Sequence, residues 1–182
     1  MPNTIQIQKT LSNSLPKLIA WPLLALLFAS LFSTTNSVNA AGDNSIEWQT
    51  WGANVFTRAK AKNKIVLLNL EAVWCHWCHV MAHESFEDPQ TAELMNRFFI
   101  NVKVDREERP DVDALYQEAL RLTGRVGGWP LTMFLTPDGR PFFGGTYFPA
   151  QMEAGKPNFR EVLWQVANMW RQNPDDAFEQ SK

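Results

Sequence analysis

The feature that most constrains the fold is the run Trp-Cys-His-Trp-Cys-His at residues 74–79, which holds the only two cysteines of the chain. Residues 64–70 before it are rich in branched apolar side chains and predict a short buried strand, and residues 80–86 after it predict a helix. At such a turn the first sulfur lies near unpaired backbone N–H groups and the positive end of the helix dipole, which favours thiolate over thiol. We therefore predict a redox centre in which Cys75 attacks and Cys78 resolves the mixed disulfide.

Length and composition restrict which class of protein this chain can be. The chain has 182 residues, a formal net charge of -2 and 45% hydrophobic residues, so nothing favours a nucleic-acid partner. Two cysteines cannot form the framework of a disulfide-stapled mini-protein, which leaves them free for chemistry. The length suits one well-packed domain and a removable segment.

Residues 1–40 have the features of an export signal. Lys9 and Lys17 supply positive charge, and the segment contains no acidic residue. The apolar run at 18–32 is shorter than the roughly 20 residues that a membrane span needs, which favours a cleaved signal over a retained anchor. Cleavage is expected after Ala40, which places residues 41–182 in an oxidising compartment, the bacterial periplasm or another extracytoplasmic space.

The rest of the chain alternates predicted helices and strands. Trp48, Trp51, Val55 and Phe56 recur at helical spacing and predict a first helix. Further helices are expected at 89–99, at 111–122 with an apolar face of Val112, Leu115, Ala119 and Leu122, and after Asn158; strands are expected at 100–105, 131–135 and 141–143. The polar tail from Asn173 is expected to fray. This order predicts an α/β sandwich around one mixed sheet.

A resemblance to a known family is carried by several long motifs. They are Cys-His-Trp-Cys-His-Val-Met at 75–81, Glu-Ser-Phe at 84–86, the charged segment 104–113, Gly-Gly-Trp-Pro at 127–130 and Gly-Gly-Thr-Tyr-Phe-Pro at 144–149. Together they resemble the thioredoxin-like domain of the spermatogenesis-associated protein family, which is DsbH-like and belongs to the thioredoxin superfamily. The resemblance covers about residues 46–172 and implies a thioredoxin-like three-layer sandwich with a central mixed sheet.

The resemblance also implies roles for residues beyond the cysteines. Pro130 would be a cis proline facing the dithiol, and Gly128 and Trp129 would present main chain to a bound substrate. Ordinary thioredoxins have a buried aspartate six residues before the first cysteine, and this chain has Asn69 there, which cannot accept a proton. Glu71 is therefore the candidate proton relay. Larger family members continue into a helical, sugar-enzyme-like domain whose activity should not be carried over.

Two other kinds of site use the same residues. Cys-x-x-Cys followed by His79 is also the attachment pattern of c-type haem, in which His79 would bind iron. The preceding buried strand and the motifs downstream disfavour this c-type haem carrier. Zinc would use Cys75, Cys78, His79 and His83, but structural zinc sites draw ligand pairs from separated segments and these four lie close together.

The sequence thus favours an exported thiol-disulfide oxidoreductase with a redox-active disulfide and neither metal nor cofactor. A protonated His76 would favour thiolate on Cys75, and Trp74 and Trp77 would contact the substrate. Its partners would be protein thiols or disulfides and a redox protein that resets the dithiol. The alternative is a non-catalytic binding module in which the charged loop at 105–113 and the terminal helix contact a partner.

Overall fold

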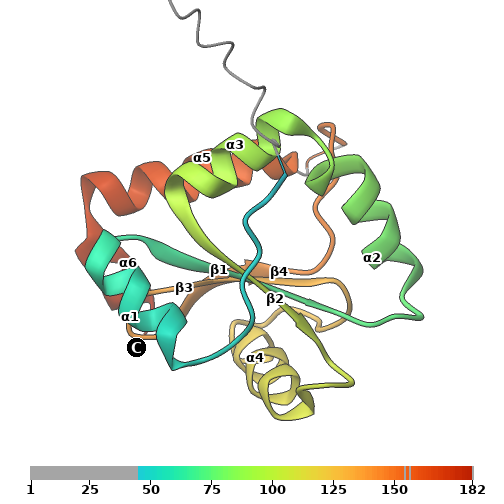
Figure 1. Ribbon diagram of the computed structural model, residues 1–182, viewed down its shortest axis with the longest axis horizontal. Coiled ribbons are helices and arrows are strands. Elements are labelled where there is room, and N and C mark those ends of the chain that lie inside the picture. The colour runs from blue at the N-terminus through green and yellow to red at the C-terminus, as the bar shows by residue number, and fades with distance from the viewer. Residues whose placement is uncertain (1–44, 154, 156, 182) are drawn as a thin grey trace, which may run out of the picture. The chain divides into compact units, whose positions relative to one another are not determined.

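The computed structural model describes residues 45–153, 155 and 157–181. A four-stranded sheet runs through it in the order β2-β1-β3-β4 (Figure 1). The strands are β1 (Ile65–Glu71), β2 (Phe99–Asp105), β3 (Leu131–Leu135) and β4 (Pro141–Gly145). β1 is parallel to β2 and antiparallel to β3, and β3 and β4 form an antiparallel hairpin. The predicted mixed sheet is confirmed.

β1 lies in the middle of this sheet, and its composition follows from that place. Residues 65–70 are all buried, because helices cover both faces of the sheet. A strand covered on both faces needs a continuous apolar run rather than alternation. Asn69 is the one polar residue in the run, and its side chain is fully buried.

The helices form an outer layer on each face of the sheet (Figure 1). One face carries α2 (His76–Met81), α3 (Pro89–Phe98) and α5 (Phe159–Gln172), whose apolar residues pack with Ile65 and Leu67 of β1. The other carries α1 (Ala53–Lys62) and α4 (Pro110–Leu122), which pack on Val66 and Leu68. This is the expected three-layer sandwich.

Side-chain caps begin two of these helices where the sequence predicts them. The carboxylate of Asp88 accepts a hydrogen bond from the Thr91 N–H at 2.9 Å, and Pro89 occupies the first turn of α3. The side chain of Asn158 accepts from the Glu161 N–H at 2.9 Å and begins α5. Each cap satisfies a donor that the first helical turn leaves without a partner.

The first predicted helix is wrong in its first half, since α1 begins only at Ala53. Gln49 instead pairs with β2: its N–H donates to the Asn101 carbonyl at 2.9 Å, and its carbonyl accepts from the Lys103 N–H at 3.1 Å. Trp51 packs edge-on against Phe56 at 5.3 Å. Pairing with the sheet therefore overrides the helical spacing of the tryptophans.

Two further predictions fail on the helices near the surface. On α4, Leu115 and Leu122 are 60% and 80% exposed, and Tyr116 and Leu120 are buried instead. The buried face of α4 also contains polar residues. The spacing of the apolar residues alone therefore predicts the wrong face as buried. The tail is helical instead: α6 (Pro174–Gln180) buries Ala177, and the Phe178 ring packs against that of Trp170, with centroids 5.8 Å apart.

The predicted export segment, residues 1–40, lies outside the described residues. Among the residues that the structure describes, no helix is long and apolar enough to cross a membrane.

Candidate redox site

Cys75 and Cys78 are joined by a disulfide at the point where β1 leads into α2, and their Cα atoms lie 5.3 Å apart. Cys75 is the N-cap residue of α2, and its Sγ accepts a hydrogen bond from the Cys78 N–H at 3.1 Å. The two residues are only 6% and 4% exposed. The sequence thus folds locally as predicted, with the first sulfur at the start of a helix.

Three exposed apolar side chains lie next to this buried pair in the sequence: Val73, Trp74 and Trp77, which are 67%, 61% and 53% exposed and form what we call the apolar rim. The Trp77 ring packs against Tyr147, with centroids 5.0 Å apart, and against His76 at 5.6 Å. Exposed apolar patches of this kind mark sites of contact with other molecules. The structure places the predicted residues Trp74, Trp77 and His76 beside the dithiol.

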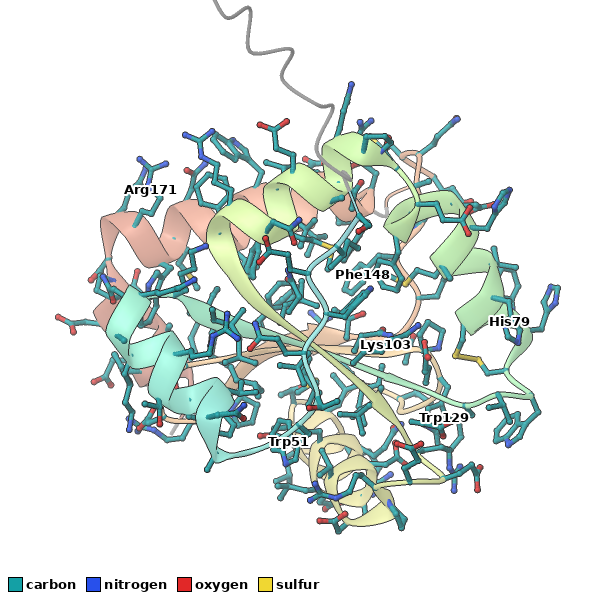
Figure 2. All side chains as sticks on the ribbon, in the orientation of Figure 1. Trp51, His79, Lys103, Trp129, Phe148 and Arg171 are labelled. Atoms are coloured by element: carbon teal, nitrogen blue, oxygen red, sulfur yellow. A yellow bond between two sulfur atoms is a disulfide. The ribbon has the colours of Figure 1, made fainter. Side chains whose placement is uncertain are left out.

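The Gly127–Trp129 loop lies against the same pair. The Trp129–Pro130 peptide bond is cis, and the Trp129 ring packs on a small cluster of Ala72, Cys75 and Cys78. The rings of Trp129 and Trp74 meet edge to face at 5.6 Å. Figure 2 shows Trp129 beside the disulfide, with His79 on the other side of it. Residues that are far apart in the sequence thus form one surface.

His79 and His83 have hydrogen-bond partners of their own. One ring nitrogen of His79 lies 2.9 Å from the Val73 carbonyl, and one of His83 lies 2.8 Å from a Glu87 carboxylate oxygen. In the described part of the chain, no three His, Cys, Asp or Glu side chains come close enough together to hold a metal ion. The structure therefore does not gather the four residues of the zinc alternative, and it gives His79 a role in holding the loop before Cys75.

Glu71 ends β1 on the face that α2 covers. Strand alternation puts Asn69 and Glu71 on the same face as Leu67, which packs with Met81 of α2. A Glu71 carboxylate oxygen lies 3.0 Å from the Lys103 ammonium, and the other accepts a long hydrogen bond from the Asn69 side chain at 3.4 Å. The predicted relay residue is thus fixed by two neighbours on the dithiol side of the sheet.

The helix after the dithiol changes geometry at η1 (Ala82–Phe86), a π-helical turn in which the Glu87 N–H donates to the Ala82 carbonyl at 3.0 Å. Such turns are frequent at functional sites. Here the turn places Glu84 where it accepts a hydrogen bond from the Tyr147 hydroxyl at 2.9 Å. Burial and this carboxylate raise the pKa of Tyr147 to about 12, so Tyr147 remains a hydrogen-bond donor.

Sequence reasoning assigned no role at this site to two residues of α4, Asp113 and Gln117. Both are buried and both bond the Gly127–Trp129 loop. The available signal was their spacing of four, which places two polar side chains on one helical face next to Val112 and Tyr116. Apolar periodicity alone could not show that this face contacts a loop.

With this geometry in view, comparisons with known proteins establish the family. The sequence model of the family described as "Thioredox_DsbH: Protein of unknown function, DUF255" matches residues 30–182. This chain belongs to that family. A solved structure named "DsbH Oxidoreductase" superposes with a TM-score of 0.53 over 71% of this chain and 87% of that one. The two sequences are 17% identical, so this likeness shows the thioredoxin-like fold alone.

Similar sequences come from much longer animal proteins. Spermatogenesis-associated protein 20 of Rattus norvegicus is 42% identical over 139 residues, and the human protein of that name is equally similar. Uncharacterized protein B0495.5 of Caenorhabditis elegans is 46% identical over 129 residues. The matched region is 76% of this chain for the rat protein and 71% for the nematode protein, but only 18% of either relative. The chain is thus similar to one portion of these relatives.

Proposed function

We propose that the protein is a thiol-disulfide oxidoreductase that exchanges disulfides with protein substrates through Cys75 and Cys78. The observation that carries the proposal is the buried disulfide at the start of α2, packed against Trp129. A thioredoxin-like fold with a Cys-x-x-Cys pair supports this class of reaction. The direction of exchange in the cell depends on the reduction potential of the dithiol and on the partner that resets it.

The exchange proceeds in two balanced steps. The Cys75 thiolate attacks one sulfur of a substrate disulfide, which forms a mixed disulfide and releases the other substrate sulfur as a thiolate. The Cys78 thiolate then attacks the Cys75 sulfur, which forms the Cys75–Cys78 disulfide and releases the second substrate thiolate. The protein loses two electrons and the substrate gains them; the reverse sequence oxidises a substrate dithiol.

The start of α2 supports the assignment of Cys75 as the attacking sulfur. The Cys78 N–H that donates to Cys75 Sγ at 3.1 Å would stabilise a thiolate there after reduction. His76 follows immediately and is exposed, so a positive charge on its ring would also favour the thiolate of Cys75.

The second step needs a group that takes the Cys78 proton, and we assign this role to Glu71. Its carboxylate lies on the face covered by α2 and is held by Lys103 at 3.0 Å. Asn69 occupies the buried place where thioredoxins have an acid, and an amide cannot accept the proton. The carboxylate two residues later supplies the missing base.

The substrate would lie on the apolar rim. Trp74 and Trp77 provide exposed aromatic surface, and Pro130, Gly128 and Trp129 provide main chain near the sulfurs. An extended polypeptide with apolar residues next to its cysteine fits such a surface. The chemistry requires neither a metal nor a bound cofactor.

Export is part of the proposal and rests on the sequence of residues 1–40. In an oxidising compartment a second redox protein must reset the dithiol after each cycle. Intact mass of the protein recovered from an extracytoplasmic fraction tests this point. Loss of residues 1–40 would support a cleaved signal, and full length in the cytoplasm would contradict export.

The decisive test of the proposed function uses Cys75→Ser in an insulin-reduction assay with dithiothreitol. We expect the variant to lose at least 99% of the activity, because the attacking sulfur is gone and the residual thiol of Cys78 is buried. Cys78→Ser is the matched control and should trap a mixed disulfide on Cys75. If Cys75→Ser keeps full activity, the protein is not this enzyme, and a docking role for the apolar rim becomes the better hypothesis.

A further inference from the structure

The buried polar pair on α4 has no role in the sulfur chemistry described above. Asp113 and Gln117 are each 6% exposed, and the Gln117 side chain donates to Asp113 at 3.3 Å. Burying polar groups costs free energy unless they are hydrogen-bonded. Their partners outside α4 are Gly128, Trp129 and Arg106, so the pair faces the loop that ends at the cis bond.

Gln117 binds both main-chain groups of Gly128. The Gly128 N–H donates to Gln117 Oε1 at 3.0 Å, and Gln117 Nε2 donates to the Gly128 carbonyl at 3.0 Å. A side-chain amide thus pairs with the backbone as a neighbouring strand would. The fit explains the preceding glycine as well, because a Cβ at residue 127 would collide with Gln117 Oε1.

Asp113 fixes the ring of the next residue. The Trp129 indole N–H donates to Asp113 Oδ1 at 2.9 Å, and the Arg106 guanidinium lies over the ring, 4.3 Å from its centroid. Arg106 Nε is also 3.9 Å from Asp113 Oδ2, which offsets the charge of a buried carboxylate. The ring is therefore held in the orientation in which it packs on the dithiol cluster.

The opposite wall of the site is joined to the same segment. The Trp74 indole N–H donates to a Glu107 carboxylate oxygen at 3.2 Å, and its ring meets that of Trp129 at 5.6 Å. Arg106 contacts both rings, with its guanidinium 5.8 Å from the Trp74 ring centroid and 4.3 Å from that of Trp129. The charged loop at 105–113 and the start of α4 thus hold both aromatic walls of the site.

We propose that Gln117 and Asp113 are positioning residues that fix the main chain of Gly128 and the ring of Trp129 for binding of a polypeptide substrate. The inference rests on the proposed function. It also gives a structural role to the charged segment at 105–113, which holds the aromatic rings beside the dithiol. Both residues bond the loop, and the sulfurs are held by α2. Their loss should therefore weaken recognition of a polypeptide and leave the reactivity of the dithiol unchanged.

The test compares two oxidised substrates on the reduced full-length protein. Insulin presents polypeptide main chain, whereas 5,5′-dithiobis(2-nitrobenzoate) is a small disulfide with none. For Gln117→Leu, which removes both bonds to Gly128, we expect the second-order rate constant with insulin to fall on the order of tenfold. The rate constant with the small disulfide and the dithiol potential against glutathione should stay within twofold of the wild type.

Four further variants make the result specific. Gln117→Glu keeps the acceptor for the Gly128 N–H and loses the donor to the Gly128 carbonyl, so its insulin rate should also fall. This variant provides the test if Gln117→Leu does not fold. Asp113→Leu removes the acceptor for the Trp129 indole and should lower the insulin rate, and Asp113→Asn, which retains an acceptor, should restore most of that rate. Tyr116→Phe on the same helix loses only a 3.1 Å bond to the Gly139 carbonyl, far from the loop, and should change neither rate.

The outcomes separate the two proposals. Equal falls with both substrates would mean that the residues only support the fold of the site, and an unchanged insulin rate would mean that they hold nothing that the substrate needs; either result overturns this inference alone. A wild-type protein that reacts with neither substrate would refute the proposed function and this inference with it.

Discussion

Asn69 and Glu71 lie two residues apart on β1 and differ in how deeply their side chains are buried. Both side chains lie on the face of the sheet beneath α2, but Asn69 is fully buried and Glu71 is partly open and paired with Lys103. A carboxylate at the buried place would bear a larger desolvation cost than one at the strand end. The sequence could show that an acid is missing at residue 69, and only the alternation of β1 shows that Glu71 shares its face.

Replacement of Glu71 by Gln should slow the second step of exchange. We expect the rate of resolution of the mixed disulfide to fall by roughly 10²-fold, the lower range for loss of a general base. The first step, attack by Cys75, should be unaffected. Rapid-mixing experiments with a substrate that changes absorbance on each thiol release would measure both steps.

Lys103→Met is the control for this prediction, because it removes the 3.0 Å ion pair and leaves the carboxylate in place. Its effect on resolution should be small. If Lys103→Met and Glu71→Gln slow resolution equally, the ion pair matters and the proton-transfer role of Glu71 is wrong.

At the scale of single elements, helix α3 depends on one capping residue. Asp88 accepts from the Thr91 N–H at 2.9 Å and from the Thr91 hydroxyl at 2.7 Å. Partial burial raises the pKa of Asp88, but these hydrogen bonds and Arg160 outweigh it and hold the pKa below the ordinary value of 3.8. Asp88 and Pro89 could be recognised from the sequence because a cap and a first-turn proline are local signals.

Asp88→Ala should lower the free energy of unfolding by about 1 kcal/mol at pH 7, through loss of the cap. Because the pKa is lower in the folded state, the contribution of the carboxylate is fully present above about pH 4 and is lost as the pH falls below that. The difference in the free energy of unfolding between the wild type and Asp88→Ala should therefore become smaller as the pH is lowered. Urea unfolding at pH 7 and pH 3 measures it.

Asp88→Asn distinguishes the cap from its charge, because asparagine is an equally good N-cap and does not titrate. Its stability relative to Asp88→Ala should be the same at both pH values. A gap between wild type and Asp88→Ala that does not change with pH would contradict the assignment of a lowered pKa to Asp88.

At the scale of the whole molecule, aromatic residues pack the layer of α2, α3 and α5 against one face of the sheet. Phe159 is fully buried, with the rings of Phe86 and Phe148 at 5.7 and 6.0 Å. Phe86 ends the π-helical turn after α2, so this cluster links the last long helix to the segment that carries the dithiol. The abundance of aromatic residues is thus largely explained by the core.

Phe159→Ala should reduce the free energy of unfolding by about 3–5 kcal/mol, since it leaves a cavity in a packed core. Trp164→Ala, on the same helix but 46% exposed, should cost much less. Urea unfolding of the oxidised proteins compares the two. Equal losses would show that α5 is not held by its buried face.

The sequence by itself determined the cysteine pair at the strand-to-helix turn, the buried central strand, the caps of α3 and α5, and the mixed α/β order. All of these depend on neighbours within a few residues, such as a Cys-x-x-Cys spacing, an apolar run or an Asp-Pro step. The tertiary structure decided the rest. It paired Gln49 with β2, because an edge strand offers hydrogen bonds that outweigh helical spacing. It also turned Asp113 and Gln117 toward Gly128 and Trp129, because buried polar groups must find partners that no local pattern can name.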